Sequence, residues 1–145
     1  MRNLFMFPLA GALALSGALA LPAAAATVSY AAVLISSAEA PPNDSKGTGE
    51  VAASFDTVSN KLSWTITYTG LSGPATAAHF HGPAAVGANA GPVVPIPATG
   101  LASPIKGDVT LTEAQAKDLA DGRWYFNIHT AAHGPGEIRG QVMKK

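Results

Sequence analysis

The chain has 145 residues, nine Lys and Arg against nine Asp and Glu, no cysteine, and 48% hydrophobic residues. This length predicts a single domain besides any targeting segment. The balanced charge provides no electrostatic attraction to nucleic acid or to an anionic membrane surface, so we expect neither as a partner. Without cysteine there can be no disulfide and no thiolate metal site, and the hydrophobic core must stabilise the fold.

The first 26 residues predict a secretory signal peptide. Arg2 precedes an apolar run from Leu4 to Leu21, and the small residues that follow provide an A-x-A site with cleavage expected after Ala26. The mature domain is then 27–145, exported to a periplasm or to the outside, with no membrane attachment after cleavage. A retained membrane anchor is the alternative interpretation, because the apolar run is long enough to span a bilayer.

Alternation of apolar and polar residues predicts strands along most of the remaining chain. They are expected at residues 27–35, 50–56, 61–69, 76–81, 93–97, 105–111, 123–130 and 137–143. Stretches rich in Pro and Gly predict loops at 36–49 and 82–92. Thr112 and Gln115 have the spacing of a capping box, and Gly122 can end a helix, so one short helix is expected near 113–121. About eight strands and one helix predict an all-β fold, an antiparallel Greek-key sandwich or barrel of immunoglobulin-like or Cu,Zn superoxide dismutase-like type.

Three of the four histidines are predicted to share one face of this sheet. Side chains alternate along a strand, so His79 and His81 lie opposite the core residues of their strand, and His129 does so on the strand 123–130. If the two strands are neighbours, the three imidazoles converge outside the core. Neutral imidazole suits transition metals, and we expect copper first and zinc second. Bonds of about 2 Å to one ion require ring nitrogens roughly 3–4.5 Å apart. His133 is a candidate fourth ligand, and its neighbours Gly134 and Pro135 also fit a loop residue.

Other interpretations of these residues stay open. The histidines can be structural, bonding to carbonyls of the loop 82–91, in a non-enzymatic extracellular adhesion or interaction module with a protein or matrix partner. Arg139 and Glu137 share a face of the last strand and are expected to form a surface or loop-bracing ion pair. Arg139 is also a candidate for guiding an anion to the histidines. Tyr125 and Asn127 are expected to support the ligands by hydrogen bonds.

Several motifs resemble the chordin-type (CHRD) domain family, in order along 30–142. The matching segments are Ala38–Pro42, Gly70–Gly73, Ala77–Pro83 (AAHFHGP), Leu111–Glu113, Asn127–Thr130 (NIHT) and Gly136–Val142 (GEIRGQV). The resemblance implies a β-rich, immunoglobulin-like or barrel fold in exported proteins. It implies no single activity.

The histidine pattern is also similar to that of copper-type superoxide dismutases, which carry His-x-His on one strand and a further His on a late strand. The likeness assigns copper-ligand roles to His79, His81 and His129, and it makes a copper-dependent oxidoreductase a third candidate function. The sequence has no counterpart of the bridging histidine and aspartate of the zinc subsite, and no disulfide. Whether the protein is an enzyme is therefore open at this stage.

Overall fold

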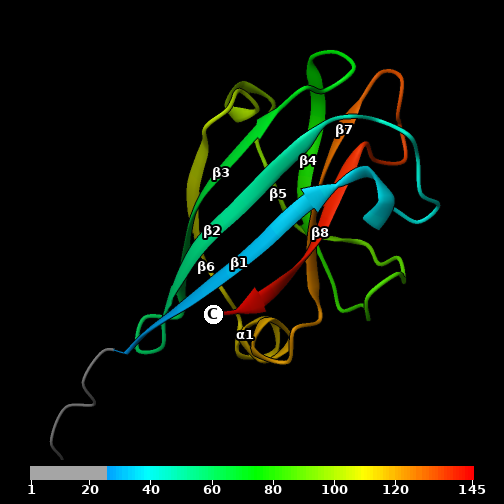
Figure 1. Ribbon diagram of the computed structural model, residues 1–145. Helices are drawn as coiled ribbons and strands as arrows, with labels where there is room; N and C mark the ends of the chain where they lie inside the picture. Colours follow the sequence, from blue (N-terminus) through cyan, green and yellow to red (C-terminus); the bar gives the residue numbers. More distant parts are fainter. Residues whose placement is uncertain (1–25) are drawn as a thin grey trace, which may run out of the picture.

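The computed structural model describes residues 26–145 (Figure 1). The predicted signal peptide, apart from Ala26, lies outside these residues. Eight strands, one α-helix and two short 3-10 helices form the domain. They are β1 Thr27–Ile35, η1 Ser36–Ala38, β2 Thr48–Asp56, β3 Lys61–Thr69, β4 Ala75–His81, β5 Pro92–Pro95, η2 Ala98–Gly100, β6 Ile105–Thr110, α1 Glu113–Ala120, β7 Trp124–Thr130 and β8 Ile138–Lys144. Between residues 26 and 145, no helix is long and apolar enough to cross a membrane.

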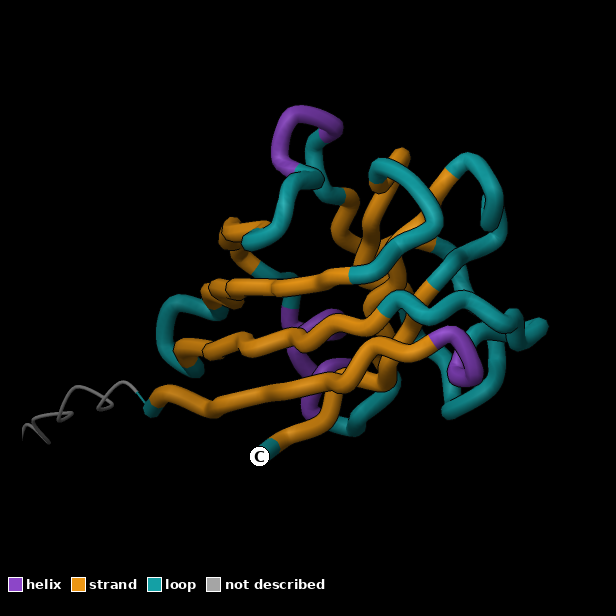
Figure 2. Tube along the Cα trace, turned by 45° about the horizontal axis from the view of Figure 1, so that its top comes forward, coloured by secondary structure: helices purple, strands orange, loops and turns teal. Residues whose placement is uncertain are grey.

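All eight strands belong to one antiparallel sheet with the order β5-β4-β7-β8-β1-β2-β3-β6. β4 pairs with β7 although β5, β6 and α1 lie between them in sequence, which is a Greek-key connection. The sheet curls until its end strands β5 and β6 line a common hollow, so the barrel is nearly closed (Figure 2). The predicted all-β Greek-key class with one short helix is confirmed.

The interior of the barrel holds the alternate apolar residues that the sequence pattern places there. On β3, Leu62 and Ile66 are fully buried, and Trp64 packs edge-on against Phe80 of β4 with ring centroids 5.2 Å apart. Phe80 also contacts Phe126 of β7 at 4.8 Å. Because this aromatic contact fixes β4 and β7 on their inner side, their other residues must face outward.

The helix α1 forms as predicted. The Thr112 side chain accepts a hydrogen bond from the Gln115 backbone, and the Gln115 side chain accepts one from the Thr112 backbone, which completes a capping box. Leu119 is the helix residue that reaches the core. Gly122 has φ +68° and follows the helix end, a conformation that favours glycine.

Two loops cover the outer face of β4, β7 and β8. One contains residues 36–47 and the other residues 82–91, and the Asn89 side chain donates to the Ala40 carbonyl between them at 2.9 Å. The sequence predicts that Tyr125 and Asn127 face outward, and they do lie on that face of β7. They are nevertheless only 3% exposed, because the two loops fold over them. The polar site described next therefore lies between the sheet and these loops.

Candidate metal site

The three predicted histidines come together on the outer face of β4 and β7. Ala77 of β4 lies opposite His129 of β7, and His79 lies opposite Asn127. His79 and His129 are thus diagonal neighbours across one strand pair, and His81 is the next outward-facing residue along β4. The sequence could place each histidine on a face, and the β4–β7 pairing brings the faces together.

The imidazole rings are close enough to share one ion. Nδ1 of His79 lies 3.3 Å from Nε2 of His129. The centroid of the His79 ring lies 5.3 Å from that of His81 and 5.2 Å from that of His129. The centroids of His81 and His129 are 6.4 Å apart. One nitrogen from each ring lies within 4.8 Å of the other two. The widest of these separations is slightly above the range of about 3–4.5 Å that bonds of about 2 Å to one ion require.

The outer nitrogens of two rings are already fixed by backbone carbonyls. Nδ1 of His81 bonds the Ala90 carbonyl at 2.9 Å, and Nδ1 of His129 bonds the Gly134 carbonyl at 2.8 Å. A carbonyl only accepts, so each of these Nδ1 atoms carries the proton, and each Nε2 keeps its lone pair. This is the arrangement of metal-binding histidines in general, where a second hydrogen bond sets the tautomer. Since Nε2 of His129 accepts, Nδ1 of His79 donates to it.

Protonation of His79 and of His81 is disfavoured. Burial lowers the pKa of His79, and the neighbouring His129 and His81 lower it further. The pKa of His81 is also lowered, mainly by burial, although its contact with Ala90 acts in the opposite direction. Neutral imidazole is the form that binds a metal ion, so these shifts favour a ligand role.

A stack of three planar groups holds His81. Its ring is parallel to Tyr125 within 2°, with centroids 4.7 Å apart. The Arg139 guanidinium lies 3.4 Å from the centre of the Tyr125 ring, reaching it from β8, on the other side of β7. The Tyr125 hydroxyl donates to the Ala90 carbonyl, which also accepts from His81. The loop 82–91 and the stack together orient this imidazole.

The structure corrects what was expected of Arg139 and Glu137. Arg139 is 2% exposed and donates to the Asn89 side chain and the Ala88 carbonyl, so it is not presented to an incoming anion. Glu137 is fully buried, and its carboxylate is bonded to Ser45, Ser72 and Thr130 rather than to Arg139. The predicted ion pair is wrong, because the surrounding loops bury both side chains and give each its own partners.

His133 lies in the turn between β7 and β8, half-buried, and is not part of the histidine trio. Its backbone closes that turn through bonds with Thr130. His133 is therefore a loop residue. Because it lies outside the trio, it serves as a histidine for comparison with His79, His81 and His129.

Glu39 is a buried residue near the site that the sequence analysis did not single out. It is 6% exposed, and its carboxyl faces the amide of Asn127 beside Gly136. Burial raises its pKa to about 7, against the opposing effects of Arg139 and Asn127. Glu39 lies in the Pro-rich segment 38–42 of the chordin-type motif, which was the available signal, but a lone Glu in a loop does not indicate where its side chain packs.

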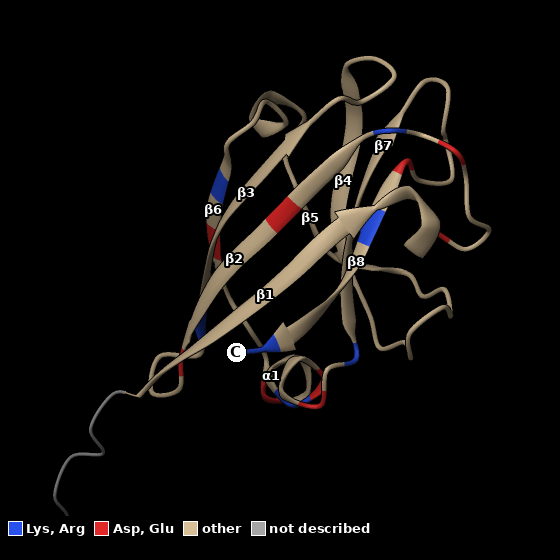
Figure 3. Ribbon diagram, viewed as in Figure 1, with Lys and Arg blue, Asp and Glu red and all other residues tan. Residues whose placement is uncertain are grey.

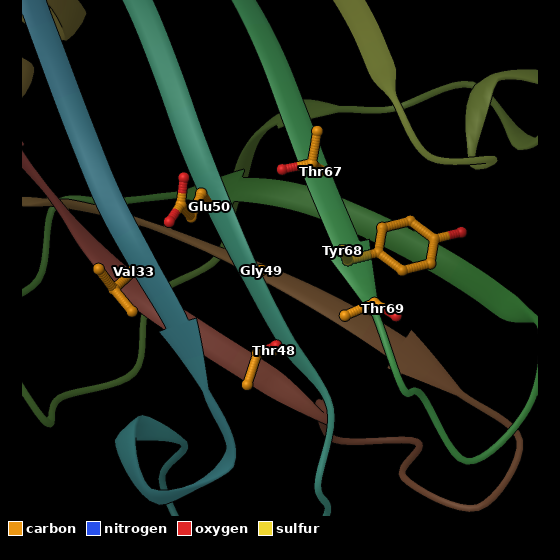
Figure 4. A pocket seen from close by; sticks show the side chains of 7 residues that line it. All are labelled: Val33, Thr48, Gly49, Glu50, Thr67, Tyr68 and Thr69. Atoms are coloured by element: carbon orange, nitrogen blue, oxygen red, sulfur yellow. The ribbon is translucent and has the colours of Figure 1, made fainter.

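Other hollows lie away from the histidines. Figure 4 shows one on the outer face of β1, β2 and β3, lined by seven residues. They are Val33, Thr48, Gly49, Glu50, Thr67, Tyr68 and Thr69. Glu50 is its only charged residue, so it offers no paired acid and base. In the ribbon of Figure 3, the positions of acidic and basic residues are interspersed along the strands and helix.

Fold and site together define an all-β, nearly closed Greek-key domain with three histidines that could hold a metal ion. The model of the CHRD domain family matches residues 30–142, and the chain belongs to this family. The resemblance predicted from the sequence motifs is thereby confirmed. No curated protein and no solved structure matches the chain.

Proposed function

We propose that this protein is an exported copper-binding CHRD domain whose ligands are His79, His81 and His129. The observation that carries the proposal is the position of the two Nε2 lone pairs of His81 and His129, each fixed by a carbonyl bonded to the opposite ring nitrogen. The trio consists of three histidines, so each of its members offers a nitrogen donor. Three imidazole nitrogens favour Cu(II) over Zn(II), which is the second choice.

Export is part of the proposal. The apolar N-terminal run and the small residues before Thr27 support it, and β1 begins at Thr27, so cleavage after Ala26 removes no residue of the barrel. N-terminal sequencing of the protein recovered from outside the cytoplasm should begin at Thr27. Recovery of uncleaved chain in the membrane fraction would favour the anchor instead.

Copper titration of the purified protein, followed by visible absorption and metal analysis, tests the metal site. We expect one Cu(II) per chain in the wild type, and at least a 100-fold weaker affinity in His79→Ala and His81→Ala. His133→Ala is the matched control, because it removes a histidine outside the trio and should bind copper like the wild type. Equal binding by all four proteins, or no binding by the wild type, would favour structural histidines and an interaction module.

A copper-dependent oxidoreductase of superoxide dismutase type is the second candidate. His79 and His129 are half-buried rather than enclosed, so a three-histidine site remains accessible from outside, as reactive metal sites are. Superoxide turnover by the copper-loaded protein distinguishes an enzyme from a binding domain. Because Arg139 is buried, we expect no contribution from it to anion guidance.

A further inference from the structure

Three buried hydrogen-bond acceptors near the trio have no partner. They are Oε1 of Glu39, Nε2 of His81 and Oδ1 of Asn127, and the His81 and Asn127 side chains are 8% and 3% exposed. The side chains of His81 and Asn127 are within hydrogen-bonding reach of each other, yet Nε2 of His81 has no proton to donate, because its proton is on Nδ1. Two lone pairs in such proximity leave a place for a cation.

The orientation of the Asn127 amide is fixed from its other end. Its NH₂ group faces the Glu39 carboxyl beside Gly136, and it lowers the pKa of that carboxyl. A side chain at position 136 would overlap Glu39 and would lie 2.8 Å from Nδ2 of Asn127, so only glycine lets the two groups meet there. Gly136 has φ +142°, a backbone conformation that other residues rarely adopt. With the NH₂ group held by Glu39, the carbonyl oxygen is directed away from it, toward His81.

Asn127 also occupies the centre of the outer face. It lies directly opposite His79 in the β4–β7 pair, and His129 is two residues further along the same face of β7. His81 is two residues from His79 on β4. Asn127 therefore lies between the three histidine positions on the sheet, on the side from which a fourth donor to a common ion can come.

We propose that Oδ1 of Asn127 is a fourth donor to the ion held by His79, His81 and His129, and that Glu39 is the positioning residue that orients it. This inference rests on the proposed metal site. A neutral amide oxygen adds no charge, and such oxygens occur as weak axial ligands of copper. The site would then be three nitrogens and one oxygen, with the oxygen on the buried side.

The first test is Asn127→Leu, which keeps the approximate side-chain volume and removes the oxygen. We expect one Cu(II) per chain as in the wild type, a displaced visible absorption band and altered electron paramagnetic resonance parameters, and affinity about 10-fold weaker, as for other lost supporting groups. Spectra identical to those of the wild type would overturn the inference. Failure of the wild type to bind copper would instead overturn the proposed function.

Two further sets of variants keep the test decisive. Asn127→Asp retains an oxygen and adds a negative charge, so it should bind Cu(II) more tightly than the wild type with a changed spectrum; this variant decides the matter if Asn127→Leu does not fold. Glu39→Gln retains an acceptor for the Asn127 amide and should keep the wild-type spectrum. Glu39→Leu removes it and should change the spectrum in the same direction as Asn127→Leu. A wild-type spectrum in Glu39→Leu would contradict the positioning role.

Discussion

At the scale of single residues, two buried carboxyls in this domain have opposite environments. Four hydrogen bonds reach Glu137, two from Ser72 and one each from Ser45 and Thr130, at 2.5–2.7 Å. Burial by itself raises the pKa of Glu137, but these bonds outweigh it and hold the pKa at about 2. Glu39 has fewer donors, so burial dominates and its pKa is about 7. The number of donors decides whether a buried carboxyl is charged.

The four hydrogen bonds to the Glu137 carboxylate should make the stability of the fold sensitive to acid. A folded-state pKa below the unfolded value of about 4.5 contributes stability that is complete above pH 4.5 and is lost as pH falls toward 2. The shift corresponds to about 3 kcal/mol. We expect Glu137→Gln to lower the free energy of unfolding by about 2–3 kcal/mol at pH 7 and by roughly half as much at pH 3, in urea denaturation at both pH values. An equal loss at the two pH values would show that the charge of Glu137 is not involved.

Glu39 should act in the opposite direction. Its folded-state pKa lies above the unfolded value, so it contributes stability that is complete below pH 4.5 and is lost as pH rises through about 7. Relative to the wild type, Glu39→Gln should therefore gain about 1–3 kcal/mol between pH 5 and pH 8, because its amide does not ionise. Chemical denaturation across this range measures the gain. A stability difference that does not change with pH contradicts the assignment.

At the scale of the elements, the pairing of β8 with β1 depends on a close backbone approach. A Cβ added at Gly140 would overlap the Val33 carbonyl of β1, which cannot move without breaking the sheet. In this stretch the paired residues are Ile35 with Arg139 and then Ala31 with Met143. Arg139 precedes Gly140, so the close contact between β8 and β1 also sets the position from which the Arg139 guanidinium reaches the Tyr125 ring.

We expect Gly140→Ala to destabilise the domain by about 3 kcal/mol or more, because the new methyl group must displace strand backbone. Gly73→Ala is the matched control, since an added Cβ there meets no atom within 4 Å, and it should change stability by less than about 0.5 kcal/mol. Urea midpoints of both variants provide the comparison. Similar midpoints would mean that β1 and β8 adjust more freely than this contact allows.

At the scale of the whole molecule, the proposed metal site links elements far apart in the sequence. β4 and β7 carry the histidines, and the loop 82–91 provides the Ala90 carbonyl to both His81 and Tyr125. A ligand that binds only the folded state stabilises it in proportion to the logarithm of its concentration. Copper binding at this site should therefore stabilise the entire barrel and not only the loops.

At a free copper concentration of 100 times Kd, the expected stabilisation is about 2.7 kcal/mol, or roughly 10 °C in Tm for a domain of this size. Because the pKa values of His79 and His81 are lowered from 6.5, the shift should persist at pH 6.5 and be lost only at lower pH. Thermal unfolding with and without copper, at several pH values, measures it. His133→Ala should show the same copper-induced rise in Tm as the wild type. A rise of the same size in His81→Ala would place the ion elsewhere.

Period-two alternation in the sequence determined most of the strands and the face on which each histidine lies. The strand at 61–69 and the capped helix were predicted nearly to the residue, because apolar spacing and capping are local properties. Local pattern also predicted that Tyr125, Asn127, Arg139 and Glu137 face away from the core. It could not indicate that two loops would cover them.

Only the tertiary structure decided which strands are neighbours and what covers their outer face. The β4–β7 pairing brought His129 to His79 across 50 residues, and it left His133 in a turn. The contact of Glu39 with Asn127 spans a still longer separation and depends on the space left by Gly136. The physical reason is that side-chain alternation follows from backbone geometry within one strand, whereas burial and hydrogen-bond partners depend on the packing of distant segments.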